Sequence, residues 1–210
     1  MLDPRQIERI CEARHGDPFA VLGMHRDDLG RLWVRAMLPG ASRVRVVDAA
    51  RGHIVADLLL RHPAGFFEGT VPAAAPFRYQ LRIDAADSTR TIDDAYRFGP
   101  VLSETDLWLL AEGTHQRPFE VLGAHPRVID DVAGTAFAVW APNAERVSVT
   151  GDFNDWDGRR HPMRLRPGAG IWEIFVPAVG AGARYKFELR RRADGGTAYK
   201  CDPYGRQAEL

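Results

Sequence analysis

The chain has 210 residues, of which 45% are hydrophobic, 10% aromatic and 27% charged. That composition is ordinary for a globular protein, and it excludes a disulfide-stapled mini-protein and a largely disordered chain. The 28 basic and 28 acidic residues cancel, so we expect no nucleic-acid partner. No apolar run approaches the roughly 18 residues of a membrane span, and residues 1–20 lack a signal-peptide pattern. We therefore expect a cytoplasmic protein without a membrane partner.

Two residue types are rare in this chain. The two cysteines, Cys11 and Cys201, stand at opposite ends, which is typical of reduced thiols and matches no metal or redox motif. Lysine occurs only at Lys186 and Lys200, because arginine supplies the other basic positions. A lysine is therefore an unusual choice in this chain.

The first half opens on a helix signal and continues as strands. Asp3 is placed to cap the helix, with Pro4 in its first turn. One apolar stripe follows, formed by Ile7, Ile10 and Cys11. Beyond a His-x-x-Pro-Phe-x-Val-Leu-Gly-x-His segment, short runs bounded by Pro, Gly and Asp predict strands over residues 32–37, 43–47, 66–71 and 77–83.

The second half repeats this order. Ser103 and Asp106 resemble a capping box, and Gly113 is placed to end the helix. The apolar stripe consists of Leu107, Leu110 and Ala111. Strands are predicted over residues 136–140, 146–150, 171–176 and 185–189.

The two halves are copies of one domain. When residue n is placed over residue n+100, the segments 15–25 and 115–125 are identical at seven of eleven positions. Short strands with Gly and Pro turns, and no alternating helices, favour a β-sandwich over a parallel sheet. We predict two tandem sandwiches, over residues 1–101 and 102–210, each preceded by a short helix.

No catalytic constellation, metal site or cofactor site is predicted. Nucleophile-elbow, zinc-protease, phosphate-loop and dinucleotide motifs are all missing from the sequence. Four histidines recur at the same place in both copies, which indicates a structural role in a loop: His15, His25, His115 and His125. Neighbouring carboxylates such as Asp152 and Asp155 are typical of turns.

One aromatic and polar cluster occurs only in the second copy. The string Gly-Asp-Phe-Asn-Asp-Trp-Asp-Gly over residues 151–158 places Trp156 in a polar loop, where a large ring is hard to bury. Sugar sites combine an aromatic face with amide or ammonium groups. The candidate binding residues are therefore Trp156, Asn154 and Lys186, with Trp172 and Tyr199 as further candidates. Alternatively, Trp156 and Trp172 are core aromatics.

These motifs resemble one enzyme family. The duplicated His-x-x-Pro-Phe-x-Val-Leu-Gly-x-His segment, the Trp-Ala-Pro string from Trp140, the Gly-Asp-Phe-Asn-Asp-Trp string and the Tyr-Lys-Phe string from Tyr185 are similar to the amino-terminal part of bacterial 1,4-α-glucan branching enzymes. The resemblance implies two immunoglobulin-like β-sandwiches, the second a family 48 carbohydrate-binding module. It also implies a TIM-barrel catalytic domain whose acidic residues would lie beyond Leu210.

The resemblance implies a non-catalytic part of an enzyme of glycogen biosynthesis. The partners would be α-1,4-glucan, as glycogen or malto-oligosaccharides, and the catalytic domain of the parent enzyme. The glucan contacts would fall on Trp156, Lys186 and Tyr199, with Asn154 nearby. Two alternatives stay open: a purely structural module that docks on the catalytic domain, or the corresponding part of a debranching enzyme or trehalohydrolase.

Overall fold

A computed structural model describes residues 2–207 of the chain. The chain divides into two compact units, Met1–Phe98 and Gly99–Leu210, and each is described by itself. The sequence repeat places the boundary near residue 101, whereas the units divide after Phe98. None of the helices within residues 2–207 has the length and apolar character needed to cross a lipid bilayer.

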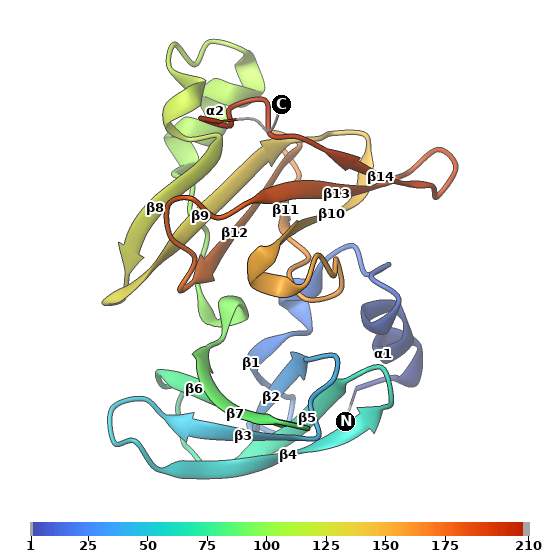
Figure 1. The fold of residues 1–210 in the computed structure, drawn as a ribbon, viewed down its shortest axis with the longest axis vertical. Coiled ribbons are helices and arrows are strands. Elements are labelled where there is room, and N and C mark those ends of the chain that lie inside the picture. The colour runs from blue at the N-terminus through green and yellow to red at the C-terminus, as the bar shows by residue number, and fades with distance from the viewer. Residues whose placement is uncertain (1, 208–210) are drawn as a thin grey trace. The chain divides into compact units, whose positions relative to one another are not determined.

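The first unit is a β-sandwich with one helix. Its elements are α1 (Pro4–Cys11), η1 (Pro18–Ala20), β1 (Gly23–Arg26), β2 (Leu32–Met37), β3 (Arg43–Asp48), β4 (Ile54–His62), β5 (Phe66–Val71), β6 (Tyr79–Ala85), β7 (Ser88–Asp93) and η2 (Ala95–Arg97). The strands lie in the order β1-β2-β5-β4-β3-β6-β7 (Figure 1). Strand β4 is shared between the two layers, because its first half pairs with β3 and its second half with β5.

The core of the first unit lies between these layers. Side chains from β2 and β5 meet those from β3 and β6, and the fully buried ones include Val34, Val46, Phe67 and Leu81. Helix α1 covers the other face of β2 and β5, where Ile7 and Ile10 pack with Met37 and Phe66. Its start is capped as the sequence predicts, since the Asp3 carboxylate accepts a hydrogen bond from the Arg5 N–H at 3.0 Å.

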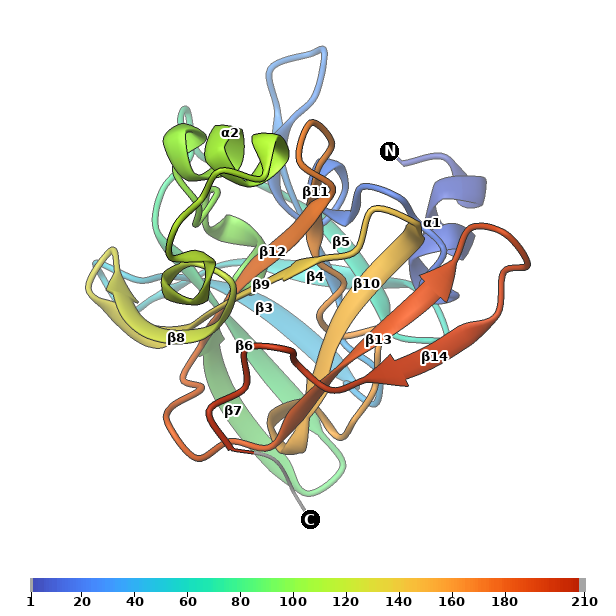
Figure 2. The same ribbon diagram turned by 90° about the horizontal axis from the view of Figure 1, so that it is seen from above.

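The second unit is a sandwich of two separate sheets. Its elements are α2 (Glu104–Glu112), η3 (Pro118–Glu120), β8 (Gly123–Ile129), β9 (Val132–Trp140), β10 (Ala144–Gly151), η4 (Asp152–Asn154), β11 (Arg164–Arg166), β12 (Ile171–Pro177), β13 (Tyr185–Arg191) and β14 (Thr197–Lys200). One sheet has the order β11-β12-β9-β8 and the other β10-β13-β14, as the view in Figure 2 also shows. The prediction of two tandem β-sandwiches is confirmed.

The duplicated segment has the same role in both units. His25 Nε2 lies 2.8 Å from the Leu22 carbonyl, and His125 Nε2 lies 2.9 Å from the Leu122 carbonyl. After the last strand of each unit an aspartate accepts a hydrogen bond from a tyrosine hydroxyl on an earlier strand. Tyr79 donates to Asp94, and Tyr185 donates to Asp202. These contacts hold the loops in their folded conformation. His25 and His125 therefore have the structural role that their duplication indicates.

The structure adds strands that the sequence pattern does not predict. The eight predicted segments all lie in or overlap strands, but β1, β4, β7, β8, β11 and β14 were not predicted. Strand β7 is exposed along most of its length, so it has no alternation of apolar and polar residues. Strand β11 has only three residues. Short and exposed strands carry too little hydrophobic periodicity to be recognised.

Candidate functional site

Side chains that point into the second unit hold the loop between β10 and β11 in place. Phe153 turns inward and stacks on Phe137 with ring centroids 5.9 Å apart. The Asn154 amide makes three hydrogen bonds: its oxygen accepts from the Gly151 N–H at 2.9 Å, and its nitrogen contacts the Val149 carbonyl at 2.9 Å and His161 Nδ1 at 2.8 Å. Asn154 is therefore occupied in holding the loop, which we call the platform loop (residues 152–163).

Burial keeps the histidine of this loop neutral. His161 is partly buried, and this burial, followed by the nearby Arg160 guanidinium, lowers the pKa of His161 to about 4. The Asn154 amide nitrogen donates toward its Nδ1, which only a ring without a proton on Nδ1 can accept. The platform loop thus depends on an uncharged imidazole.

Trp156 stands at the tip of the platform loop. Asp155 and Trp156 both adopt left-handed backbone conformations, with φ of 57° each, which non-glycine residues adopt only when their surroundings impose it. The indole N–H donates to the Asp152 carboxylate at 3.1 Å, and the Arg184 guanidinium holds that carboxylate at 2.9 Å. These contacts hold the N–H edge of the indole in place, while Trp156 stays 38% exposed. A fixed, accessible indole is suited to stacking on a flat apolar ligand.

Lys186 and Tyr199 lie on the strands beside this loop. Lys186 pairs with Thr150 across β10 and β13, while Tyr199 on β14 pairs with Glu188. Lys186 and Glu188 are two residues apart on β13 and so share its outer face. The Lys186 ammonium has no hydrogen-bond or ion-pair partner within residues 2–207, and Tyr199 is 53% exposed. Both side chains offer polar groups to a ligand.

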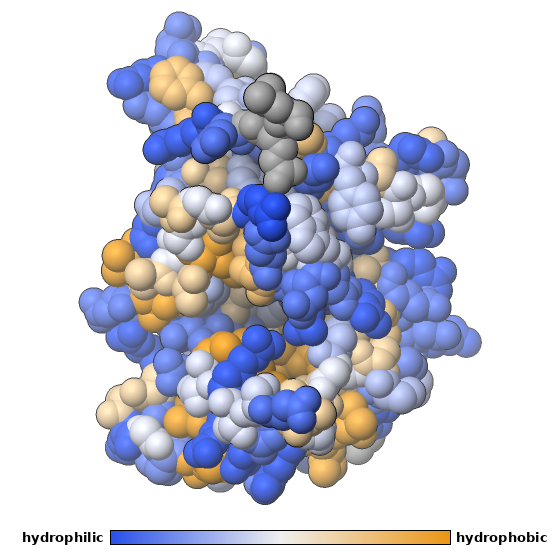
Figure 3. All heavy atoms as spheres, viewed as in Figure 1, coloured by the Kyte–Doolittle hydropathy of each residue, from blue (hydrophilic) through white to orange (hydrophobic). Residues whose placement is uncertain are grey.

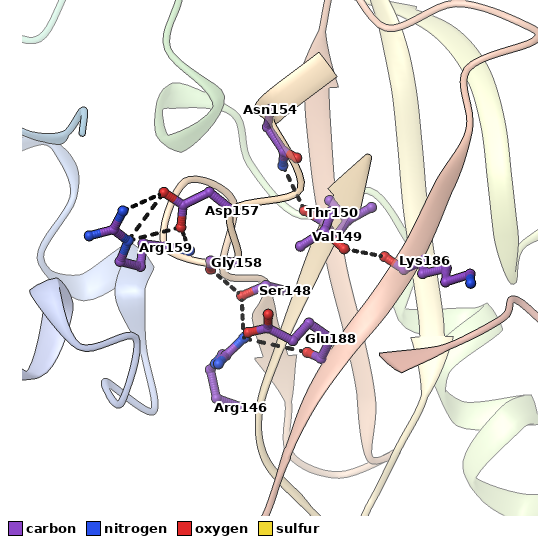
Figure 4. Close-up of polar contacts among 10 residues, drawn as sticks. All are labelled: Arg146, Ser148, Val149, Thr150, Asn154, Asp157, Gly158, Arg159, Lys186 and Glu188. Atoms are coloured by element: carbon purple, nitrogen blue, oxygen red, sulfur yellow. Dashed lines mark hydrogen bonds and ion pairs between the residues drawn. The ribbon is translucent and has the colours of Figure 1, made fainter. Parts of the chain in front are cut away.

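A buried ion pair lies beneath this surface (Figure 4). Arg146 Nη1 lies 2.6 Å from Glu188 Oε1 and 2.8 Å from the Ser148 hydroxyl, which itself donates to the Gly158 carbonyl at 2.7 Å. The neighbouring Glu188 carboxylate raises the pKa of the Tyr199 hydroxyl, and burial raises it further. The network therefore joins β10, β13, β14 and the platform loop.

The five predicted binding residues separate into two groups. Trp156, Lys186 and Tyr199 reach the surface around the outer face of β10, β13 and β14. Trp172 on β12 is fully buried, and its indole N–H donates to the Ala141 carbonyl at 3.1 Å. Asn154 is 2% exposed. Trp172 and Asn154 therefore offer no surface to a ligand, and the alternative role of core aromatic applies to Trp172.

Sequence reasoning missed the residues beneath the surface. Arg146 and Glu188 are ordinary strand residues in the sequence, and nothing in their spacing links them. A signal was present in the strand alternation, because Glu188 follows the inward-facing Phe187 and must share a face with Lys186. Its partner could not be identified without the register between β10 and β13.

Other large apolar side chains are exposed away from the platform loop. Trp108 on α2, Phe119 in η3 and Trp140 at the end of β9 are each more than half exposed. On the face seen in Figure 3, apolar residues form separate patches among hydrophilic ones. Within residues 2–207 no cluster of His, Cys, Asp or Glu side chains is arranged to hold a metal ion.

Two family comparisons match separate parts of the chain. Residues 121–205 match carbohydrate-binding module 48, the isoamylase N-terminal domain, and residues 3–96 match the N-terminal domain of the alpha-1,4-glucan branching enzyme GlgB. The fold and these matches define a carbohydrate-binding N-terminal region of an α-amylase-family enzyme. The two matches occur in tandem, so the chain is similar to a two-module N-terminal region of a glycogen branching enzyme.

Solved structures with a similar chain trace include several pullulanases. The pullulanase from Anoxybacillus sp. LM18-11 is 17% identical, with 87% of this chain and 25% of that chain covered and a TM-score of 0.33. PulA from Klebsiella oxytoca is 18% identical, with 88% and 19% covered and a TM-score of 0.33. The chain thus spans a quarter or less of the length of these enzymes.

Proposed function

We propose that this chain binds α-1,4-glucan on the outer face of its second unit, through Trp156, Lys186 and Tyr199. The observation that carries the proposal is the fixed, exposed indole of Trp156 within a unit of the carbohydrate-binding module 48 family. A glucose ring has an apolar face that can stack on the indole, and hydroxyls that the Lys186 ammonium and the Tyr199 hydroxyl can reach as partners.

The charge of the chain fits a neutral ligand. Its basic and acidic residues balance, so long-range attraction contributes nothing to binding, and affinity must come from stacking and hydrogen bonds. One stacked sugar contributes on the order of 1 to 2 kcal/mol, by analogy with other aromatic stacking. We therefore expect weak binding per chain end, strengthened when a branched polymer offers many ends.

Affinity electrophoresis tests the proposal directly. Migration of the purified chain through a native gel containing glycogen should be retarded, and Trp156→Ala should weaken the retardation roughly tenfold, in line with the stacking energy. The matched control is Trp33→Ala in the first unit, which should be retarded like the wild type. If glycogen does not retard the wild-type chain, the proposal is wrong.

We also propose that the parent protein is a glycogen branching enzyme. It would cleave an α-1,4 linkage and transfer the released chain to a 6-hydroxyl, and this region would hold the glucan for the catalytic domain. The match of residues 3–96 to the branching-enzyme N-terminal domain supports this assignment over a debranching enzyme. Branching activity of the full-length protein on amylose, followed by the fall in iodine staining, tests it. Hydrolysis of α-1,6 linkages without branching would contradict it.

Docking on the parent's catalytic domain is a second candidate function. Trp140 is 64% exposed at the end of β9, and Trp108 and Phe119 are exposed on α2 and η3. Trp156 and Trp172 do not form the common apolar patch that a docking role for Trp156 would need, since Trp172 is buried. We therefore assign docking to the Trp140 region and glucan binding to the Trp156 region.

We place the protein in the cytoplasm as part of the same proposal. Cys11 is buried, Cys201 is exposed, and both are free thiols, which fits a reducing compartment. Fractionation of the source cells, with a periplasmic marker as control, tests this placement. Recovery with the periplasmic marker would contradict it.

A further inference from the structure

We propose that the buried Arg146–Glu188 ion pair positions the glucan-binding surface, by holding the platform loop and the Tyr199 ring in one fixed arrangement. The inference rests on the proposed glucan binding and names two residues that would not themselves touch the ligand. They act through Gly158 on one side and through Tyr199 on the other, so both are positioning residues.

The pair has the geometry of a fixed element. Arg146 and Glu188 are 3% and 8% exposed, and their charged groups meet at 2.6 Å. A charge pair that is removed from water to this degree is held by its hydrogen bonds, because either charge alone would be costly to bury. The pair therefore has one preferred arrangement, unlike a solvated surface ion pair.

One side of the pair is tied to the platform loop. Ser148 accepts from Arg146 Nη1 and donates to the Gly158 carbonyl, two residues after Trp156 in the chain. Gly158 lies so close to the Glu188 carboxylate that a Cβ at this position would collide with it. The loop that carries Trp156 therefore rests directly on the ion pair, and only glycine allows this approach.

The other side of the pair is tied to the edge strand. Tyr199 lies opposite Glu188 on β14, so the phenol ring and that carboxylate are cross-strand neighbours. An exposed tyrosine on a short edge strand would otherwise sample several rotamers, and contact with the fixed Glu188 side chain limits them. Glu188 thus contacts both halves of the proposed surface, since the platform loop lies on one side of it and Tyr199 on the other.

The first unit lacks this arrangement at the corresponding positions. The cross-strand row Ser148, Glu188 and Tyr199 corresponds to Arg45, Arg82 and Thr91 in the first unit. Two arginines face each other there, and Arg45 pairs with the Asp84 carboxylate at 2.5 Å, two residues along β6 from Arg82. The first unit does contain a buried ion pair, Arg35 with Glu68 at 3.2 Å, but on β2 and β5 of the opposite sheet. Burial of an ion pair is therefore common to both units, whereas its position under an aromatic loop is particular to the second.

A paired replacement separates positioning from stability. The double variant Arg146→Met/Glu188→Leu removes both charges while keeping side-chain volume, an exchange that buried ion pairs often tolerate without loss of folding. We expect a folded chain whose glycogen affinity is about tenfold weaker, because two aromatic groups must then be ordered upon binding. The conservative variant Glu188→Gln keeps an oxygen acceptor in place and should lie between the double variant and the wild type.

The matched control is Arg35→Met/Glu68→Leu in the first unit, which should keep wild-type affinity. Hydrogen exchange, read without any glucan, should rise in residues 152–163 of the first double variant and stay unchanged in the control. Wild-type exchange and wild-type affinity in a folded Arg146→Met/Glu188→Leu chain would overturn the inference. Failure of the wild-type chain to bind glycogen would instead overturn the proposed function, while the exchange measurement would still decide whether the pair orders the loop.

Discussion

The two units share a strand order but differ in the segment that follows β3 and β10. In the first unit the chain turns within a few residues, where the Asp48 carboxylate accepts from the Ala50 and Arg51 N–H groups, and β4 then pairs with β3. In the second unit the platform loop takes this place, and only the bridge between Ser148 and Pro162 remains of that pairing. One scaffold thus gains a candidate binding surface where a hairpin is replaced by an anchored loop.

The difference shows how an exposed tryptophan is kept in place. Phe153 and His161 point inward, with ring centroids 5.9 Å apart, while Trp156 between them points outward. The two partly buried side chains stabilise the loop, and the exposed Trp156 ring is left available for a ligand. The following predictions test this division of roles, from the largest expected effect to the smallest.

The largest effect should come from the buried tryptophan. Trp172→Ala should lower the free energy of unfolding of the second unit by about 3 to 5 kcal/mol, because it leaves a cavity and removes one of the two hydrogen bonds to the Ala141 carbonyl. Trp156→Ala should change it by only about 0.5 kcal/mol. Urea unfolding measures both values. Equal losses would show that Trp156 is a core residue after all.

Acid should weaken the second unit through His161. Its pKa is about 4 in the folded chain and 6.5 in the unfolded one, so the unfolded state binds more protons between these values and stability falls as the pH falls. The free energy of unfolding should drop by about 2 kcal/mol between pH 7 and pH 5 from this group alone.

His161→Asn removes the titrating group and keeps an acceptor near Nδ1. Its stability should therefore fall by about 2 kcal/mol less than that of the wild type over the same pH range, as measured by urea unfolding at both pH values. Identical pH dependence in the two proteins would mean that the imidazole is not held neutral in the platform loop.

A smaller effect is expected from the rare lysine. Lys186→Gln introduces the residue type that the first unit has at the corresponding position, Gln80. The variant should bind glycogen roughly three- to tenfold more weakly, because about 1 kcal/mol of hydrogen bonding is lost. The reverse change, Gln80→Lys, should add no affinity, since the first unit has no platform loop. A gain from Gln80→Lys would indicate a second binding surface.

Trp140 should have no effect on glucan binding. Trp140→Ser leaves the platform loop intact and should keep the wild-type retardation by glycogen, while activity of the full-length parent should fall if the Trp140 region docks on its catalytic domain. If Trp140→Ser abolished the retardation and Trp156→Ala left it unchanged, the assignment of the two surfaces would be reversed.

The sequence predicted the architecture better than the site. Duplication of the segment at 15–25 and 115–125 was enough to define two copies, and Pro, Gly and Asp turns were enough to predict sandwiches, which the structure confirms. The ends of the second helix are also determined by residues close in the sequence. The Ser103 hydroxyl accepts from the Asp106 N–H at 3.1 Å, and Gly113 has a φ of 70°. These features depend on neighbours in the chain, so they can be recognised without the fold.

The site depends on register and burial, which the sequence does not specify. Trp172 and Trp156 are both aromatic residues near polar ones in the sequence, yet every position from Ile171 to Val176 is buried on both faces of β12. A strand covered on both sides lacks the alternation that would have marked Trp172 as inward-facing. The sequence also predicts a ligand contact for Asn154, because its three internal partners are visible only once the platform loop is folded.

One spectrum tests the central claim most directly. The chain has five tryptophans, and each gives one indole N–H signal in a ¹⁵N-labelled sample, assigned by single Trp→Phe variants. On titration with maltoheptaose, the signal of Trp156 should shift, while that of Trp33 in the first unit and that of the buried Trp172 should stay in place. Shifts of the Trp33 or Trp140 signal with an unmoved Trp156 signal would contradict glucan binding at the platform loop.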